Sequence, residues 1–112
     1  MQQTIFIGLN AGGNPAPFTV LDQSRKADTV KANIGDEISF DSSPRGMTVE
    51  VDFFEGKSPF QEGTMVKDKT FHRVSKQGTF HYKCTLVTAD GIRHGWPDNP
   101  NDGGTVEVGS GH

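Results

Sequence analysis

The sequence predicts an all-β fold, an antiparallel Greek-key sandwich of about seven or eight strands with at most one short helical turn. Three observations lead to this prediction. Several segments alternate apolar and polar residues with the period of two that characterises a half-buried strand. The 14 glycines and 6 prolines interrupt these segments at short intervals. The 8 phenylalanines supply large apolar side chains for a core between two packed sheets.

Five strands are expected in the first half of the chain. In order, they are Thr4 to Leu9, Phe18 to Leu21, Asp28 to Ile34, Glu37 to Phe40 and Met47 to Phe53. The third alternates so that Val30, Ala32 and Ile34 share one face. The fifth alternates as well, and it follows the turn-rich segment Asp41 to Gly46.

The second half begins with a segment, Phe54 to Lys69, that lacks strand periodicity. Within it, Ser58 to Gln61 has a capping serine, a proline at the first helical position and a glutamine three residues after the cap, which predicts one short helical turn. Three further strands are expected at Lys69 to Val74, Gly78 to Cys84 and Thr105 to Val108. The connection Ser75 to Gln77 predicts a hairpin between the first two of them.

The strand Gly78 to Cys84 places Phe80, Tyr82 and Cys84 on one face. Cys84 is the only cysteine, so it is a buried thiol, a metal ligand or a reactive group rather than half of an internal disulfide. Its place in an inward-facing series favours the buried thiol. The same period predicts a core drawn from several strands: Val30, Ile38, Phe40, Val49, Val51, Phe53, Phe80, Tyr82 and Val106.

The order of these parts resembles that of the cupredoxins, the small blue-copper proteins, over roughly Phe18 to Val108. The specific stretches are Gly35-Asp-Glu-Ile-Ser-Phe40 and Gly78-Thr-Phe-His-Tyr-Lys-Cys84. A turn-rich loop, an alternating strand and an irregular excursion lie between them, and a final Gly-Gly-Thr-Val-Glu-Val strand follows. The resemblance implies that residues 1–112 form a single cupredoxin-like domain, with Cys84 at the position of the copper-ligating cysteine.

The copper ligands other than Cys84 are missing from the places that the resemblance assigns to them. A blue-copper site needs two imidazoles and a thiolate, with a weak axial ligand. The family's first histidine would fall near Met47, and the second at Leu86 or Val87. The axial methionine would fall near Ile92 or His94. The resemblance therefore implies no intact type 1 copper site, and no cofactor is expected.

A copper site of another kind is the alternative. If the fold is as predicted, Met47, Cys84 and His94 converge at one end of the sandwich and form a soft ligand set suited to Cu(I). That arrangement predicts copper handling or electron transfer. The competing interpretation places Met47 in the core and His94 in solvent, with no metal.

The loop Thr88 to Gly104 is the main candidate for a binding site, because long loops on rigid scaffolds carry function. Its candidate binding residues combine an aromatic anchor with charge, and they are Asp90, Arg93, His94 and Trp96. The resemblance to cupredoxins implies that the turn Ser43 to Gly46 lies at the same end. The sequence thus predicts a binding or interaction module. A lid role for Trp96 on the end of the sandwich is the alternative.

Composition and motifs disfavour other classes of function. The net charge of −3 comes without a basic cluster interleaved with aromatics, so nucleic acid is not an expected partner. No apolar run is long enough to form a transmembrane segment. No phosphate-cradling motif, paired acid–base carboxylates or zinc spacing indicates an enzyme. His72 and His81 are expected on neighbouring strands, exposed and without a ligand.

The expected partner is therefore a protein or a small ligand. No secretory signal precedes Thr4. This predicts a cytoplasmic location for the chain as given, or a periplasmic or secreted one if a leader has been removed.

Overall fold

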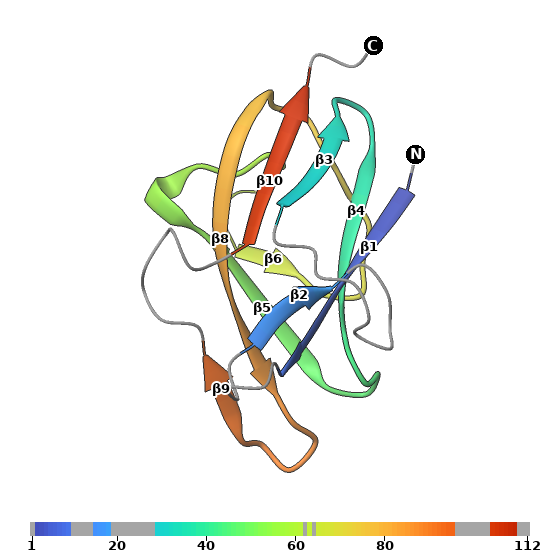
Figure 1. Cartoon of the computed structure of the whole chain (residues 1–112), viewed down its shortest axis with the longest axis vertical. Coiled ribbons are helices and arrows are strands. Elements are labelled where there is room, and N and C mark those ends of the chain that lie inside the picture. Colours follow the sequence, from blue (N-terminus) through green and yellow to red (C-terminus); the bar gives the residue numbers. More distant parts are fainter. Residues whose placement is uncertain are drawn as a thin grey trace.

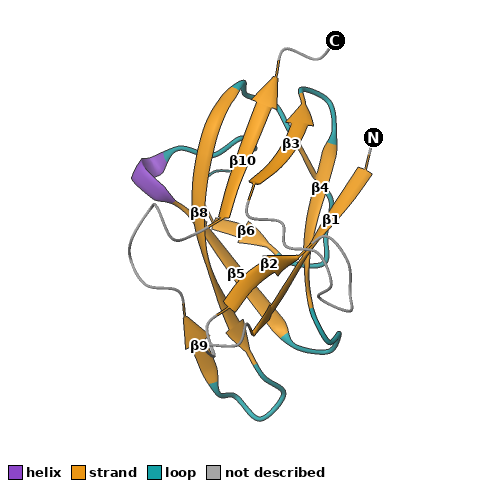
Figure 2. Ribbon diagram, in the orientation of Figure 1, coloured by secondary structure: helices purple, strands orange, loops and turns teal. Residues whose placement is uncertain are grey.

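The computed structural model describes residues 2–9, 15–18, 29–61, 63, 65–95 and 104–109. Within these ranges the chain is mainly β-structure, arranged as two sheets around one apolar core (Figure 1 and Figure 2). The predicted all-β sandwich is therefore confirmed. The helical content of the described part is one 3-10 turn, η1 (Phe54–Gly56), so it contains no helix long enough to cross a membrane.

The smaller sheet has the strand order β2-β1-β4-β7. Its strands are β1 (Gln2–Leu9), β2 (Pro15–Phe18), β4 (Glu37–Ser42) and β7 (His72–Arg73). The larger sheet has the order β3-β10-β8-β5-β6, with β9 paired to β8 beside that path. Its strands are β3 (Thr29–Asn33), β5 (Thr48–Phe53), β6 (Met65–Lys67), β8 (Gly78–Val87), β9 (Arg93–Gly95) and β10 (Gly104–Gly109).

Strand pairing differs from the expected antiparallel pattern. β1 runs parallel to β4, and β3 runs parallel to β10, so both sheets are mixed. The described ranges contain ten strands rather than the predicted seven or eight. The additional strands include β6 and β9, each of three residues, which are too short to produce a recognisable sequence period.

All nine predicted core residues are buried, with exposed fractions of 8% or less. Tyr82 lies at the centre, with its ring centroid 5.5 Å from that of Phe40 and 5.4 Å from that of Phe53. The prediction that Ile34 shares a face with Val30 and Ala32 is wrong, because those two side chains are buried and Ile34 is 44% exposed. β3 ends at Asn33, whose N–H donates to the Asp36 carboxylate, and Ile34 falls in the resulting turn.

The predicted hairpin through Ser75 to Gln77 is also wrong. β7 pairs with β4 in the smaller sheet, whereas β8 lies in the larger sheet, so this connection crosses from one sheet to the other. Val74 marks the crossing, since it is fully buried and its N–H donates to the carbonyl of Asp36 at 2.8 Å.

The short helical turn lies at η1 and not at Ser58 to Gln61. The Ser58 hydroxyl does accept the N–H of Phe60, at 3.1 Å, as a capping serine would. Phe60 nevertheless forms an isolated bridge with Val74 and is fully buried, with its ring 5.8 Å from that of Phe53. Burial of this aromatic side chain outweighs the local helical signal.

The expectation that His72 is exposed is overturned, since only 7% of the residue is accessible. Its Nε2 donates to the carbonyl oxygen of Lys67 at 2.7 Å, and its ring lies 5.6 Å from that of Phe60. His81 lies on the outer face of β8, half-buried rather than exposed, with Nδ1 2.9 Å from the Thr105 hydroxyl. The two histidines are thus on different sheets.

Candidate binding site at the β8–β9 hairpin

The predicted binding loop begins as an ordered hairpin that projects from one end of the sandwich (Figure 1). β8 continues to Val87, three residues beyond Cys84, and pairs antiparallel with β9. The intervening turn is closed by main-chain hydrogen bonds of 2.9 Å from Thr88 to Ile92 and from Gly91 to Thr88. Gly91 has a φ of 88°, a conformation that favours glycine. The sequence had suggested an irregular stretch here.

Asp90 stabilises this turn through its carboxylate, which accepts a hydrogen bond from the Thr88 hydroxyl. That hydrogen bond is the main reason why the pKa of Asp90 lies below its ordinary value of 3.8. The same hydroxyl oxygen accepts the N–H of Ile92 at 3.1 Å. The predicted binding residue Asp90 therefore has a clear role in holding the hairpin tip in shape.

Arg93 is a second predicted binding residue whose charge is engaged within the protein. Its guanidinium contacts both carboxylate oxygens of Glu50, one of them at 3.3 Å, and this pairing raises the pKa of Arg93. Arg93 is on β9 and Glu50 is on β5, so the pair spans the outer face of the intervening strand β8. We call this contact the Arg93–Glu50 bridge, and it ties the hairpin to the sheet.

Ile92 is the most exposed large apolar side chain in the part of the chain that the structure describes, at 53%. It directly follows the turn at the tip of the hairpin, in which Ala89 is exposed as well. Sequence reasoning did not single out Ile92 as a binding residue. Its position directly after Asp90-Gly91 could have indicated its exposure. A turn at these two residues leaves the following side chain few neighbours to pack against.

The strand register separates the three residues of the copper alternative. Cys84 pairs with Val51 on β5. Met47 lies four residues before Val51 in the chain, which corresponds to about 13 Å along the strand direction. His94 pairs with Leu86, two residues away from Cys84 along β8, and Leu86 is fully buried. Cys84 is 1% exposed, as predicted for a buried thiol. Met47 is half-buried against the core, and His94 is half-buried at the hairpin.

The predicted turn Ser43 to Gly46 lies at the same end of the sandwich as the hairpin, because Thr48 at the start of β5 pairs with Val87 at the end of β8. Arg45 in this turn is exposed, with its Nε 3.8 Å from the Asp41 carboxylate. The turn and the hairpin therefore form neighbouring parts of one surface.

A lysine and an aspartate anchor the chain where this turn enters β5. Lys69 Nζ donates to the Met47 carbonyl at 2.6 Å and to the Asp68 carboxylate at 2.7 Å. The same carboxylate oxygen accepts the N–H of Val49 at 2.8 Å. These contacts fix the position of β5 at the end of the sandwich that carries the hairpin.

Trp96 and the rest of the loop up to residue 103 lie outside the described residues, so the lid and anchor interpretations of Trp96 both stay predictions. Among the described residues, no three His, Cys, Asp or Glu side chains are grouped so that they could hold a metal ion. The chain matches no protein-family model, and no curated protein shows significant sequence similarity to it.

Proposed function

We propose that this chain is a binding module that recognises a protein partner through the tip of the β8–β9 hairpin. The observation that carries this proposal is the 53% exposure of Ile92 on a turn whose shape is fixed by hydrogen bonds. Covering a large apolar side chain that is exposed to water is favourable, so a partner that buries it is bound more tightly. Its surroundings at the tip, Ala89 and Gly91, leave it accessible from outside.

Preorganisation is the second support for this proposal. A loop that must become ordered on binding loses conformational entropy, and this loss reduces affinity. Here the β8–β9 pairing, the Thr88–Asp90 hydrogen bond and the Arg93–Glu50 bridge already restrict the hairpin. The cost of ordering the tip is therefore low, and binding the partner requires little rearrangement.

The resemblance to cupredoxins supports a binding site at the same end of the molecule. Cupredoxin-like domains usually present their working end through the loops around the site cysteine. In this chain the strand that carries Cys84 leads directly into the hairpin, and the Ser43 to Gly46 turn is its neighbour. We therefore describe the proposed module as cupredoxin-like and without an intact type 1 copper site.

Site-specific photo-crosslinking tests the proposal. A benzophenone amino acid is placed at Ile92 and, as a matched control, at Ile34, which is also an exposed isoleucine in a turn but lies at the opposite end of the sandwich. In extracts of cells that make the protein, we expect one reproducible crosslinked protein from position 92 and not from position 34. Equal crosslinking at both positions, or none at either, would count against the proposal.

The alternative function is copper handling through Met47, Cys84 and His94. A visible absorption spectrum distinguishes it from the binding module. The register supports it less well, because Cys84 and His94 lie on different strands, β8 and β9, and Met47 precedes β5 at a different level of the sheet. Thiolate coordination of Cu(II) at Cys84 would give an absorption band at about 600 nm on addition of copper. A Cys84-dependent band would favour this alternative, and we expect none.

A further inference from the structure

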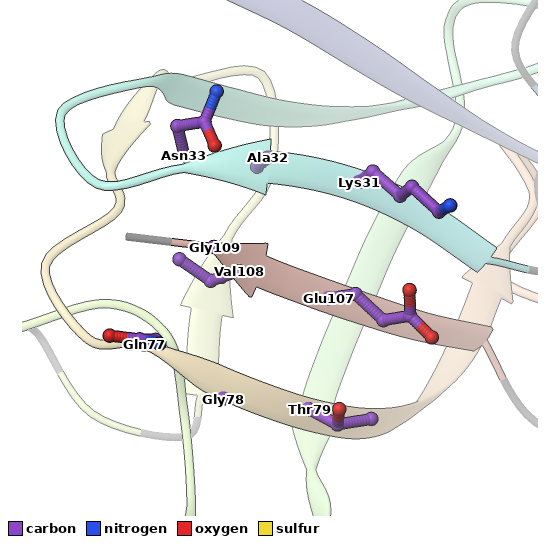
Figure 3. A pocket seen from close by; sticks show the side chains of 9 residues that line it. All are labelled: Lys31, Ala32, Asn33, Gln77, Gly78, Thr79, Glu107, Val108 and Gly109. Carbon is purple, nitrogen blue, oxygen red and sulfur yellow. The ribbon is translucent and has the colours of Figure 1, made fainter. Parts of the chain in front are cut away.

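We infer a second binding site, for short zwitterionic peptides, at the end of the larger sheet opposite the hairpin. A hollow of about 410 Å³ lies there over β3, β10 and β8 (Figure 3). The ten-residue strand β8 runs from this hollow to the hairpin, a distance of about 30 Å. The inference is therefore independent of the function proposed for the hairpin.

Two glycines line one end of the hollow. Gly109 on β10 is the register partner of Asn33 on β3 and has no side chain to fill the space on the outer face. Gly78 at the start of β8 is the partner of Val108, and its φ of 140° is another conformation that favours glycine. A Cβ atom at Gly78 would lie 3.4 Å from the Phe80 ring, on the core side, so it is Gly109 that leaves the outer face open. Gln77 and Asn33 flank the space between them, as Figure 3 shows.

Opposite charges stand side by side along the hollow. Lys31, Glu107 and Thr79 are register partners on three adjacent strands, so their side chains share the outer face (Figure 3). Lys31 and Glu107 are exposed, and within the described ranges their charged groups form neither an ion pair nor a hydrogen bond. A ligand can therefore contact an ammonium and a carboxylate without first breaking a contact between them.

The chemistry of the lining favours a short peptide over other small ligands. A dipeptide carries a carboxylate for Lys31, an ammonium for Glu107 and an amide for the Asn33 and Gln77 side chains. Among the described residues that line the hollow there is no aromatic side chain, which disfavours ligands that bind by stacking a ring. Glu107 would repel a phosphate group, so a nucleotide fits poorly.

An NMR titration of the isotope-labelled protein with glycylglycine tests this inference. We expect saturable shifts in the millimolar range, confined to amides near residues 31–33, 77–79 and 107–109. N-acetylglycine lacks the ammonium and glycinamide lacks the carboxylate, so each should bind about fivefold more weakly than the dipeptide. Absence of saturable shifts, or equal affinity for all three probes, would overturn the inference.

Amino-acid substitutions test whether the dipeptide binds in the hollow. Lys31→Gln and Glu107→Gln should each weaken the dipeptide about fivefold, whereas Lys57→Gln, an exposed lysine at η1, should leave it unchanged. Gly109→Ala should also weaken binding, since the added Cβ fills the hollow, and the spectrum itself reports that each variant is folded. Unchanged affinity in the two charge variants would contradict the site.

Discussion

Tyr82 and Gly104 are register partners on β8 and β10, and the phenol ring of Tyr82 occupies the space that a side chain on Gly104 would need. A Cβ atom at Gly104 would lie 2.7 Å from ring atom Cε1 and still closer to the hydroxyl end of the ring. The ring has little room to move, because it is fully buried and packs against Phe40 and Phe53. The central aromatic residue of the core thus depends on a glycine in the neighbouring strand.

We expect Gly104→Ala to lower the free energy of unfolding by about 2 kcal/mol, because the added methyl group overpacks the core at Tyr82. Gly109→Ala is the control on the same strand. Its Cβ would lie 3.2 Å from Asn33 Oδ1, the end of a flexible side chain, so its effect should be small. Urea denaturation compares the two variants, and equal midpoints would contradict the packing assigned to Tyr82 and Gly104.

Asp68 should contribute to stability through the N–H of Val49, since a buried main-chain donor that loses its acceptor is costly. Asp68→Ala is expected to lower the free energy of unfolding by about 2 kcal/mol. Asp68→Asn keeps an acceptor oxygen for Val49 and should cost less. If thermal and chemical denaturation showed equal losses for the two variants, the hydrogen bond to Val49 would not be the cause.

Cys84 should react slowly with thiol reagents in the native protein, because it is 1% exposed and an apolar setting suppresses thiolate formation. Full reaction is expected only after unfolding in denaturant. Cys84→Ala should lower the free energy of unfolding by about 1 kcal/mol through lost packing. Rapid stoichiometric labelling of the folded protein would refute the buried position.

Asp90 should titrate below its ordinary pKa of 3.8 in the folded protein, because the Thr88 hydroxyl donates to its carboxylate. A depressed folded pKa means that the stabilising contribution is present above pH 3.8 and is lost as the pH falls through the folded pKa. NMR titration of the carboxyl group measures this directly. Thr88→Val should return the pKa of Asp90 towards 3.8, and an unchanged value would show that another group is responsible.

The core of this sandwich could be predicted from the sequence because alternation is a local signal. Val49, Val51 and Phe53 share the inner face of β5, and their spacing alone indicates it. Pairing partners are not local. The parallel pairing of β1 with β4 joins Gln3 to Ile38 across a long stretch of sequence, and no single segment signals that contact.

The sequence indicated the position of the segment after Cys84 but not its hairpin structure or its contacts. The contact between Arg93 and Glu50 joins residues 43 positions apart, so sequence reasoning assigned Arg93 a free charge for a partner. His72 was misplaced for a similar reason, since its burial depends on Phe60 and on the crossing between the sheets. Ile92 was overlooked because exposure depends on how far the hairpin projects, which follows only from the strand pairing.

The central claim, that the hairpin tip binds a protein partner through Ile92, is tested most directly by affinity measurements with the purified crosslinked partner. Ile92→Ser should weaken binding by about 2 kcal/mol, or nearly thirtyfold in Kd, with little change in melting temperature. Ile34→Ser, a matched change at an isoleucine that is 44% exposed, should leave the affinity unaltered. Equal affinities for the wild type and Ile92→Ser, or equal losses in both variants, would contradict the claim.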